Sequence, residues 1–275
     1  MTLALAGALL VATTYPVAQT AVSLTPEQQR VFLKEAKVIQ SRPAGKGITG
    51  SLRLTLSDGA LTHDAGFQSI DDRLTPTERA QGKRRAGEAN FADSYKYNIA
   101  AYEIARLLGV DDMMPVTVER RYRNLTGSLT WWVDDVLMDE ADREKSNTLP
   151  PDSLRFGRQR QRMAIFAELL RDVDRNKGNI LYTKDWRVIM IDFSRAFRLE
   201  HALRNPNAVQ QCDRALYKKL EALSEADVRS VTKNYLTTHE IDGVMARRQL
   251  IVERLGQLIR DRGESVVLFD FASGM

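Results

Sequence analysis

The chain has 275 residues, of which 43% are hydrophobic and 28% are charged, a mixture typical of folded globular proteins. This length allows one domain of two lobes or two small domains, and it excludes a peptide hormone. The 40 Lys and Arg exceed the 36 Asp and Glu by four, which suits an anionic ligand but is too small an excess to indicate a nucleic-acid-binding protein. The single cysteine, Cys212, excludes an intrachain disulfide and a cysteine-based zinc site, and we expect it to be a small packing residue.

The N-terminal segment leaves the cellular compartment open. Residues 3–13 form an apolar run as long as the h-region of a signal peptide and too short to span a bilayer comfortably. No Lys or Arg precedes the run, and the small-residue pattern around Ala21 is weak as a cleavage site. Residues 1–24 therefore fit a signal peptide of an exported protein and an apolar segment of a cytoplasmic protein equally well. We expect no transmembrane span in the mature chain.

Ordered structure is predicted from Thr25 onwards. Thr-Pro-Glu-Gln at this point supplies an N-cap, a proline at the first helical position and a capping glutamine. The helix is expected to end near Arg42-Pro43, so that residues 25–44 form an N-terminal helical segment. A glycine-rich stretch, residues 45–50, then leads into a β-hairpin that turns at Asp58-Gly59.

The next segments predict a loop, a helix and a second hairpin. Residues 71–92 are polar and basic and are expected to form an exposed loop. Residues 94–108 carry apolar side chains at helical spacing and are expected to form a helix ended by Gly109. Strands are expected at 116–121 and 128–133. The second strand ends in Trp131-Trp132, of which we expect one ring to pack in the core and the other to line a ligand site.

The second half of the chain is predicted to be mostly helical. Helices are expected around Met163 and Leu170 and, after residue 200, near 212–223, 225–237 and 240–262, where strand-like alternation is missing. The fold class is therefore α+β, with a sheet-rich lobe over residues 45–135 and a helical lobe over residues 136–275.

The most informative residues lie between 172 and 194. Asp174 and Asn179 are five apart, which is the spacing of the Asp-x-x-x-x-Asn catalytic loop of kinases. Residues 180–191 resemble a hairpin whose turn lies about equally far from Asn179 and Asp192, so we expect these two to face each other on the order of 5 Å apart. An amide oxygen and a carboxylate can converge there on one Mg²⁺, and Asp174 can accept or orient the proton of an attacking hydroxyl.

Each of these residues alone also fits a polar loop that caps a helix and makes a turn. The ordered set of helix, Asp174, Asn179, hairpin and Asp192 favours a metal-phosphate site instead. A hydrolase that uses the same carboxylates, or an unrelated fold, remains a further interpretation.

This set resembles the atypical branch of the protein-kinase-like fold, which includes the phosphatidylinositol 3-/4-kinases, HipA-type bacterial kinases and secretory-pathway casein kinases. The likeness rests on Asp174-Arg175 with Asn179, and on Asp192 after the hairpin. A second, local likeness joins the Asn98-Ile99-Ala100-Ala101-Tyr102 stretch and Met114-Pro115-Val116-Thr117 to the type II phosphatidylinositol 4-kinases. The resemblance covers roughly residues 45–200, and only the motif at 172–193 is specific.

The resemblance implies a bilobal protein-kinase-like fold with a small antiparallel sheet lobe and a mostly helical C-terminal lobe. MgATP would lie between the lobes, with the backbone of Gly50 and Ser51 close to the phosphates. Asn179 and Asp192 would hold Mg²⁺, and Asp174 would be the catalytic residue.

The chain departs from these kinases at the lysine and glutamate that normally hold the phosphates. Alignment puts Gln68 in the place of the lysine and Asn98 in the place of the glutamate. The two amides can hydrogen-bond each other, but a neutral amide cannot offset phosphate charge as an ammonium does. Lys96 is the first candidate for a substitute cation, although on a helix it lies about 200° from Asn98.

Two functions follow as expectations. The first is an ATP- and Mg²⁺-dependent phosphotransferase, whose acceptor is a protein, a lipid head group or a small polyol. The second is a nucleotide-binding pseudokinase with a scaffold or regulatory role.

Overall fold

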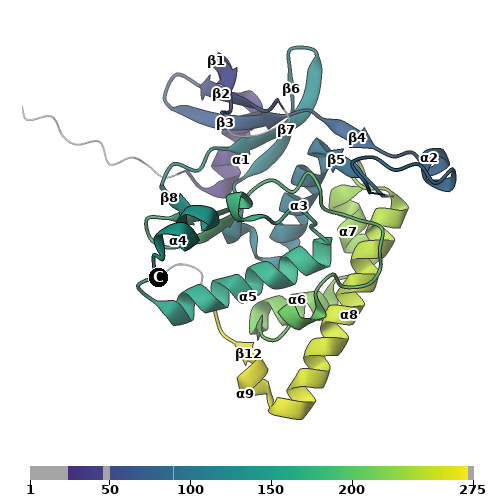
Figure 1. The fold of residues 1–275 in the computed structure, drawn as a ribbon. Helices are drawn as coiled ribbons and strands as arrows, with labels where there is room; N and C mark the ends of the chain where they lie inside the picture. The colour runs from purple at the N-terminus through teal and green to yellow at the C-terminus, as the bar shows by residue number, and fades with distance from the viewer. Residues whose placement is uncertain (1–23, 46–49, 89, 272–275) are drawn as a thin grey trace, which may run out of the picture.

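The computed structural model describes residues 24–45, 50–88 and 90–271 (Figure 1). The segment expected to be a signal peptide, apart from Leu24, and the centre of the glycine-rich stretch lie outside the described residues. A β-sheet forms one end of the molecule and a group of helices forms the other (Figure 1). Among the described residues, no helix is long and apolar enough to cross a membrane.

The sheet has five antiparallel strands in the order β1-β2-β3-β7-β6. The predicted first hairpin is confirmed, because β2 and β3 meet at Asp58, whose Oδ1 accepts from the backbone nitrogens of Ala60 at 2.9 Å and Leu61 at 2.7 Å. The strands are β1 (Lys37–Pro43), β2 (Leu52–Ser57), β3 (Thr62–Gln68), β6 (Thr117–Tyr122) and β7 (Leu125–Trp131).

The prediction that the first helix reaches Arg42-Pro43 is wrong. Helix α1 (Pro26–Glu35) begins with the expected capping box at Thr25 but ends at Glu35, and β1 follows at once. The β-branched pair Val38-Ile39 favours a strand, and pairing with β2 gives the backbone its hydrogen bonds. The glycine-rich stretch therefore connects β1 to β2, and Ala44 N donates to Ser51 O at 3.0 Å across its ends.

The segment expected to be an exposed loop contains regular structure. Strands β4 (Asp71–Arg73) and β5 (Ala92–Ser94) pair with each other, and helix α2 (Pro76–Ala80) lies between them. Polar side chains hydrogen-bond to each other here, which composition alone does not reveal. Ser94 Oγ donates to Asp71 Oδ1 at 2.7 Å. Ser94 N also donates to Ser194 O at 2.8 Å, which joins this segment to the helical part.

Helix α3 (Tyr95–Leu108) is confirmed, with Ser94 as its N-cap and Gly109 in the left-handed region at its end. It contributes to a hydrophobic core that includes residues of the sheet and of the helices. The remaining helices are α4 (Glu140–Ser146), α5 (Ser153–Leu170), α6 (Arg214–Ala222), α7 (Glu225–Thr232), α8 (Thr238–Arg262) and α9 (Glu264–Val267), with 3₁₀ turns at Asp111–Met113, Lys177–Asn179 and Pro206–Ala208.

The helical part also contains two small sheets. Strand β9 pairs with β10 in the hairpin predicted at residues 180–191 and with β8 on its other side. A short parallel pair, β11 and β12, lies in the half expected to be mostly helical, and Cys212 is buried there as expected of a packing residue. The strands are β8 (Val136–Asp139), β9 (Ile180–Thr183), β10 (Val188–Met190), β11 (Cys212–Asp213) and β12 (Leu268–Phe269).

We predict that Gly127→Ala destabilises the sheet. A Cβ at Gly127 would lie 2.2 Å from the backbone oxygen of Gln68 and 2.8 Å from the ring of Phe67, so β3 and β7 would have to move apart. Such overpacking costs about 1–3 kcal/mol of unfolding free energy. The matched control is Gly157→Ala in α5, where a Cβ meets nothing within 4 Å and the better helix former should raise stability slightly. Urea unfolding of both variants measures this, and equal midpoints would contradict the prediction.

Candidate active site

The loop after α5 is organised by a buried ion pair between Asp172 and Arg175. Helix α5 ends at Leu170, and its C-cap residue, Arg171, has a left-handed conformation that turns the chain into the loop. The Asp172 side chain has no exposed surface and accepts from Arg175 Nε at 2.8 Å and from the backbone nitrogen of Asp174 at 3.1 Å. The carboxylate therefore fixes both the guanidinium and the start of the loop that carries Asp174.

Arg175 in turn joins the loop to the end of the β9–β10 hairpin. Its Nη1 donates to the backbone oxygens of Asn179 at 2.8 Å and Ile191 at 2.6 Å, and its Nη2 donates to that of Asp192 at 3.2 Å. The guanidinium also lies 4.2 Å from the ring centroid of Phe193. One side chain thus sets the positions of the backbone at both predicted metal ligands.

The hairpin register differs from the prediction by one residue. Met190 pairs with Ile180, and Ile191 N donates to Asn179 O at 3.1 Å, so Ile191 rather than Asp192 lies opposite Asn179. Thr183 N donates to Arg187 O at 3.1 Å, so the turn comprises Lys184, Asp185 and Trp186, the last with φ of 60°. Its middle, Asp185, lies six residues from Asn179 and seven from Asp192, which makes Ile191 the facing residue. Asp192 comes directly after Ile191 and has a φ of 54°, so the chain turns away from the direction of β10 at this residue.

The predicted metal ligands retain acceptor oxygens. Asn179 Nδ2 donates to Asp174 O at 2.9 Å, which leaves the amide oxygen of Asn179 on the other side of the group. Asp192 Oδ1 accepts from Ser194 N at 3.2 Å. Among the described residues no group of three or more His, Cys, Asp and Glu could hold a metal ion alone. An amide and a carboxylate nevertheless fit Mg²⁺, which usually takes one or two carboxylates together with phosphate oxygens and water.

Gln68 and Asn98 form the expected amide pair. Asn98 Nδ2 donates to Gln68 Oε1, and Gln68 Nε2 donates to Asp192 Oδ2 at 3.4 Å. The buried Asn98 also accepts from Phe193 N at 2.6 Å through its Oδ1. The pair therefore links β3, α3 and the segment that carries Asp192, with neutral groups in place of an ion pair.

The other residues predicted to bind the nucleotide are placed less directly. Lys96 Nζ on α3 lies 2.7 Å from Asp71 Oδ2 on β4, so its charge is paired with that carboxylate. Gly50 has a φ of 63°, and the backbone oxygen of Ser51 accepts from Ala44 N where β1 and β2 are joined. Asp174 is partly exposed, and its Oδ1 accepts from Asn176 Nδ2 at 3.1 Å.

Asp93, a half-buried carboxyl on β5, belongs to the site although the sequence did not predict it. Burial raises the pKa of Asp93, the hydroxyl of Ser194 opposes this, and the neighbouring carboxylates of Asp192 and Asp174 raise the pKa further. Its position depends on the pairing of β5 with β4 and on the backbone bond between Ser94 and Ser194, so no local pattern in the sequence could reveal it.

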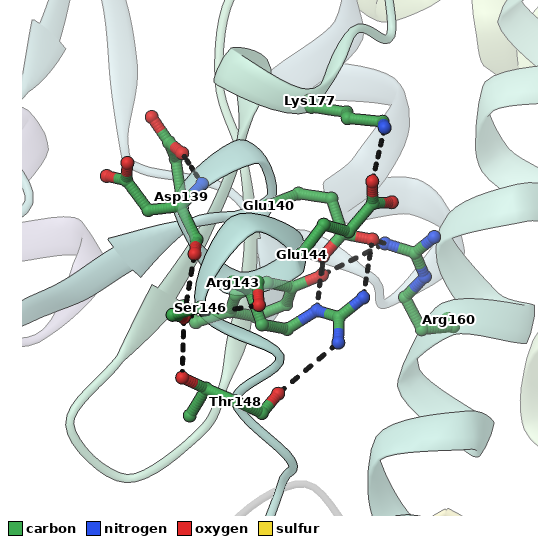
Figure 2. A network of polar contacts seen from close by, with 10 residues as sticks. Asp139, Glu140, Arg143, Glu144, Ser146, Thr148, Arg160 and Lys177 are labelled. Carbon is green, nitrogen blue, oxygen red and sulfur yellow. Dashed lines mark hydrogen bonds and ion pairs between the residues drawn. The ribbon is translucent and has the colours of Figure 1, made fainter.

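Helix α4 ties the loop to the rest of the helical part, as Figure 2 shows. Lys177, in the 3₁₀ turn just before Asn179, forms an ion pair with Glu144 on this helix. The buried Glu140 accepts from Tyr182 Oη at 2.7 Å and from Arg160 Nη1 at 3.2 Å. Although burial opposes ionisation, hydrogen bonds from Arg143 and Tyr182 keep the pKa of Glu140 below its ordinary value. The carboxylate thus stays charged and holds α4, α5 and β9 together.

Comparison with known proteins agrees with this architecture. The sequence matches no family model and no curated protein. The structure is similar to that of hydra Fam20 with sugar, with a TM-score of 0.66 and 15% identity over 90% of this chain and 93% of that one. It is also similar to the Helicobacter pylori proinflammatory kinase CtkA, with a TM-score of 0.48 and 9% identity over 85% of this chain and 98% of that one.

The chain therefore has the α+β, atypical kinase-like fold that the sequence predicted. The more specific resemblance to phosphatidylinositol kinases and HipA-type kinases stays a prediction, as do the lobe limits at residues 45, 135 and 275.

We predict that Asp93→Asn stabilises the protein at neutral pH and much less in acid. Because the folded state raises the pKa of Asp93, it holds the proton more tightly than the unfolded state. Wild-type stability therefore falls as pH rises from the ordinary aspartate pKa to the raised one. The variant lacks this loss, so its gain in urea midpoint is full at pH 7 and shrinks as pH falls through that window.

The control for this experiment is Asp185→Asn on the hairpin turn. Despite some burial, hydrogen bonds from Thr183 and the nearby Arg187 lower the pKa of Asp185, so its carboxylate stabilises the fold above the ordinary pKa. Its removal should lower the midpoint at pH 7 and have little effect in acid. A gain for Asp93→Asn that is equal at pH 4 and pH 7 would contradict the electrostatic explanation.

Proposed function

We propose that this chain is an atypical kinase that transfers the γ-phosphate of ATP to a hydroxyl group in a Mg²⁺-dependent reaction. The observation that carries the proposal is the clamp made by Arg175. It brings the Asp174 loop, Asn179 and Asp192 together at the place where the amide pair of Gln68 and Asn98 reaches Asp192.

In the proposed reaction Asn179 and Asp192 would hold Mg²⁺, which neutralises charge on the phosphates when it is bound. Asp174 would accept the proton of the acceptor hydroxyl as that oxygen bonds to the γ-phosphorus. The bond from the γ-phosphorus to the bridging oxygen breaks, and ADP leaves with the electron pair. The protein contributes positioning and fixed dipoles rather than covalent chemistry.

Gly50 and Ser51 would approach the phosphates through their backbone at the end of the β1–β2 connection. Gln68 and Asn98 would hold Asp192 in place, while Lys96 would need to leave Asp71 to reach a phosphate. Among the acceptors expected from the sequence, a small polyol is the first to screen, because the similar Fam20 structure is described with a sugar.

The second candidate function is a nucleotide-binding pseudokinase. It is favoured by the neutral character of the Gln68–Asn98 pair, which supplies no ammonium to the phosphates. This candidate shares the nucleotide and metal site and differs only in the rate of transfer.

We predict that Asp192→Asn removes Mg²⁺-dependent nucleotide binding. Asparagine tolerates the left-handed backbone at position 192, so the change removes the charge without straining the chain. Calorimetric titration with ATP in Mg²⁺ and then in EDTA measures the effect. The matched control is Asp185→Asn on the turn of the same hairpin, which should bind as the wild type does. Undiminished binding by Asp192→Asn would refute the site.

We predict that Asp174→Asn binds MgATP normally and transfers phosphate about 10²- to 10⁴-fold more slowly, because an amide cannot accept the proton. The release of ADP in the presence of polyol, peptide and lipid acceptors measures this rate. Equal transfer by wild type and variant would remove Asp174 from the mechanism. Binding without transfer to any acceptor by the wild type would instead support the pseudokinase.

A further inference from the structure

The face of the sheet that carries Gln68 also carries a charged cluster toward the β7–β8 connection. Because Gln68 contacts Asp192, this is the face turned toward the candidate site. Side chains alternate along a strand, so Gly66 and Asp64 lie on the same face as Gln68. The register of the β2–β3 pair adds Arg53, opposite Gly66, and Thr55, opposite Asp64.

Asp64 is the centre of this cluster. It accepts from Thr55 Oγ1 at 2.6 Å, Arg53 Nε at 2.6 Å and Arg42 Nη2 at 2.9 Å. Although burial opposes it, the bonds from Thr55 and Arg53 lower the pKa of Asp64, so the carboxylate is charged at neutral pH. Two guanidinium groups against one carboxylate leave an excess of one positive charge.

Arg53 is held in a fixed orientation with its outer nitrogens available. Its guanidinium carbon lies 4.0 Å from the centroid of the Trp132 ring, and its Nε is bound to Asp64. Neither of its Nη atoms hydrogen-bonds to any residue that the structure describes, and 31% of the side chain is exposed. A planar fork fixed by a carboxylate and an aromatic ring is suited to bidentate recognition of two adjacent acceptors.

Gly66 leaves the sheet bare between Arg53 and Gln68. A Cβ at this position would meet only the backbone oxygen of Thr130, at 4.0 Å. A flat ring can therefore lie against the backbone of Gly66. Since a strand advances about 3.3 Å per residue, Asp64 and Gln68 are roughly 13 Å apart along β3. Gln68 is the end of this row that contacts Asp192.

We propose that the base of the phosphate donor lies against Gly66 and that Arg53 reads its edge, so that the site prefers guanine to adenine. Guanine presents two adjacent acceptors, O6 and N7, whereas adenine presents N7 beside an amino group. The two Nη groups of Arg53 can donate to O6 and N7 of guanine. With adenine, one of these donors would face the N6 amino group, which is also a donor. The inference rests on the proposed function, because it assumes that the site takes a nucleotide, and it refines the identity of that nucleotide.

The test is calorimetric titration of the full chain with GTP and ATP in Mg²⁺, and with GMP and GDP. Wild-type protein should bind GTP roughly ten- to a hundredfold more tightly than ATP. Arg53→Leu should remove the preference of GTP over ATP, and its affinity for GMP, GDP and GTP should fall by the same factor. Arg42→Leu is the matched control, because it removes the other guanidinium bound to Asp64 without touching Trp132, and it should keep the preference.

Arg53→Lys distinguishes recognition of a base by Arg53 from binding of a phosphate by the same side chain. A lysine keeps the charge but lacks the fork, so the preference for guanine should disappear with Lys as with Leu. A loss that grows with the number of phosphates and is restored by Lys would show that Arg53 holds phosphate, which overturns the proposal. ATP binding equal to or tighter than GTP binding by the wild type also overturns it while leaving the proposed function intact. Binding of neither nucleotide overturns both.

Discussion

The candidate site depends on one buried ion pair, Asp172 with Arg175. A loop that leaves a helix and a hairpin that returns from a turn have no local reason to meet, and hydrogen bonds to three backbone oxygens from a single guanidinium hold them together. Removing one partner of a buried pair costs about 3–5 kcal/mol, because the other charge is left without compensation. Arg175 takes no part in the proposed chemistry. It nevertheless determines the positions of Asp174, Asn179 and Asp192.

The amide pair of Gln68 and Asn98 extends this frame to the sheet. In kinases with a lysine and a glutamate, the same pair both joins strand to helix and binds phosphate. Here the donors and acceptors of the two amides are engaged by Asp192, Phe193 and each other, so the joining role is kept. Neutral amides carry no positive charge that could offset the charge of a phosphate. In this chain the amide pair joins strand β3 to helix α3 without supplying a charge.

Local patterns were enough to predict much of the fold. The capping box at Thr25, the turn at Asp58-Gly59 and Gly109 at the end of α3 are each determined by neighbouring residues, and the structure contains all three. The end of α1 was not predictable in this way, because Lys37–Pro43 becomes a strand only through pairing with β2.

The parts of the site that escaped prediction depend on contacts between distant segments. The register error at Asp192 arose because the middle of the turn is Asp185, which lies six residues from Asn179 but seven from Asp192, so that Ile191 faces Asn179. Asp93 and Arg53 look like ordinary polar residues in sequence. They become informative only when β5 brings one beside Asp192 and the sheet register places the other on the face of Gln68.

The distribution of charge suggests how such a site would have to work. Asp93, Asp174 and Asp192 are close enough for two of them to raise the pKa of the third, while the charge of Lys96 is paired with Asp71 and that of Arg175 with Asp172. Phosphates approaching this group of carboxylates meet repulsion until a cation is present. Under the proposed function a divalent ion would therefore be a condition for phosphate binding rather than an aid to it, because the metal would take the electrostatic role that a lysine has in kinases with the usual lysine–glutamate pair.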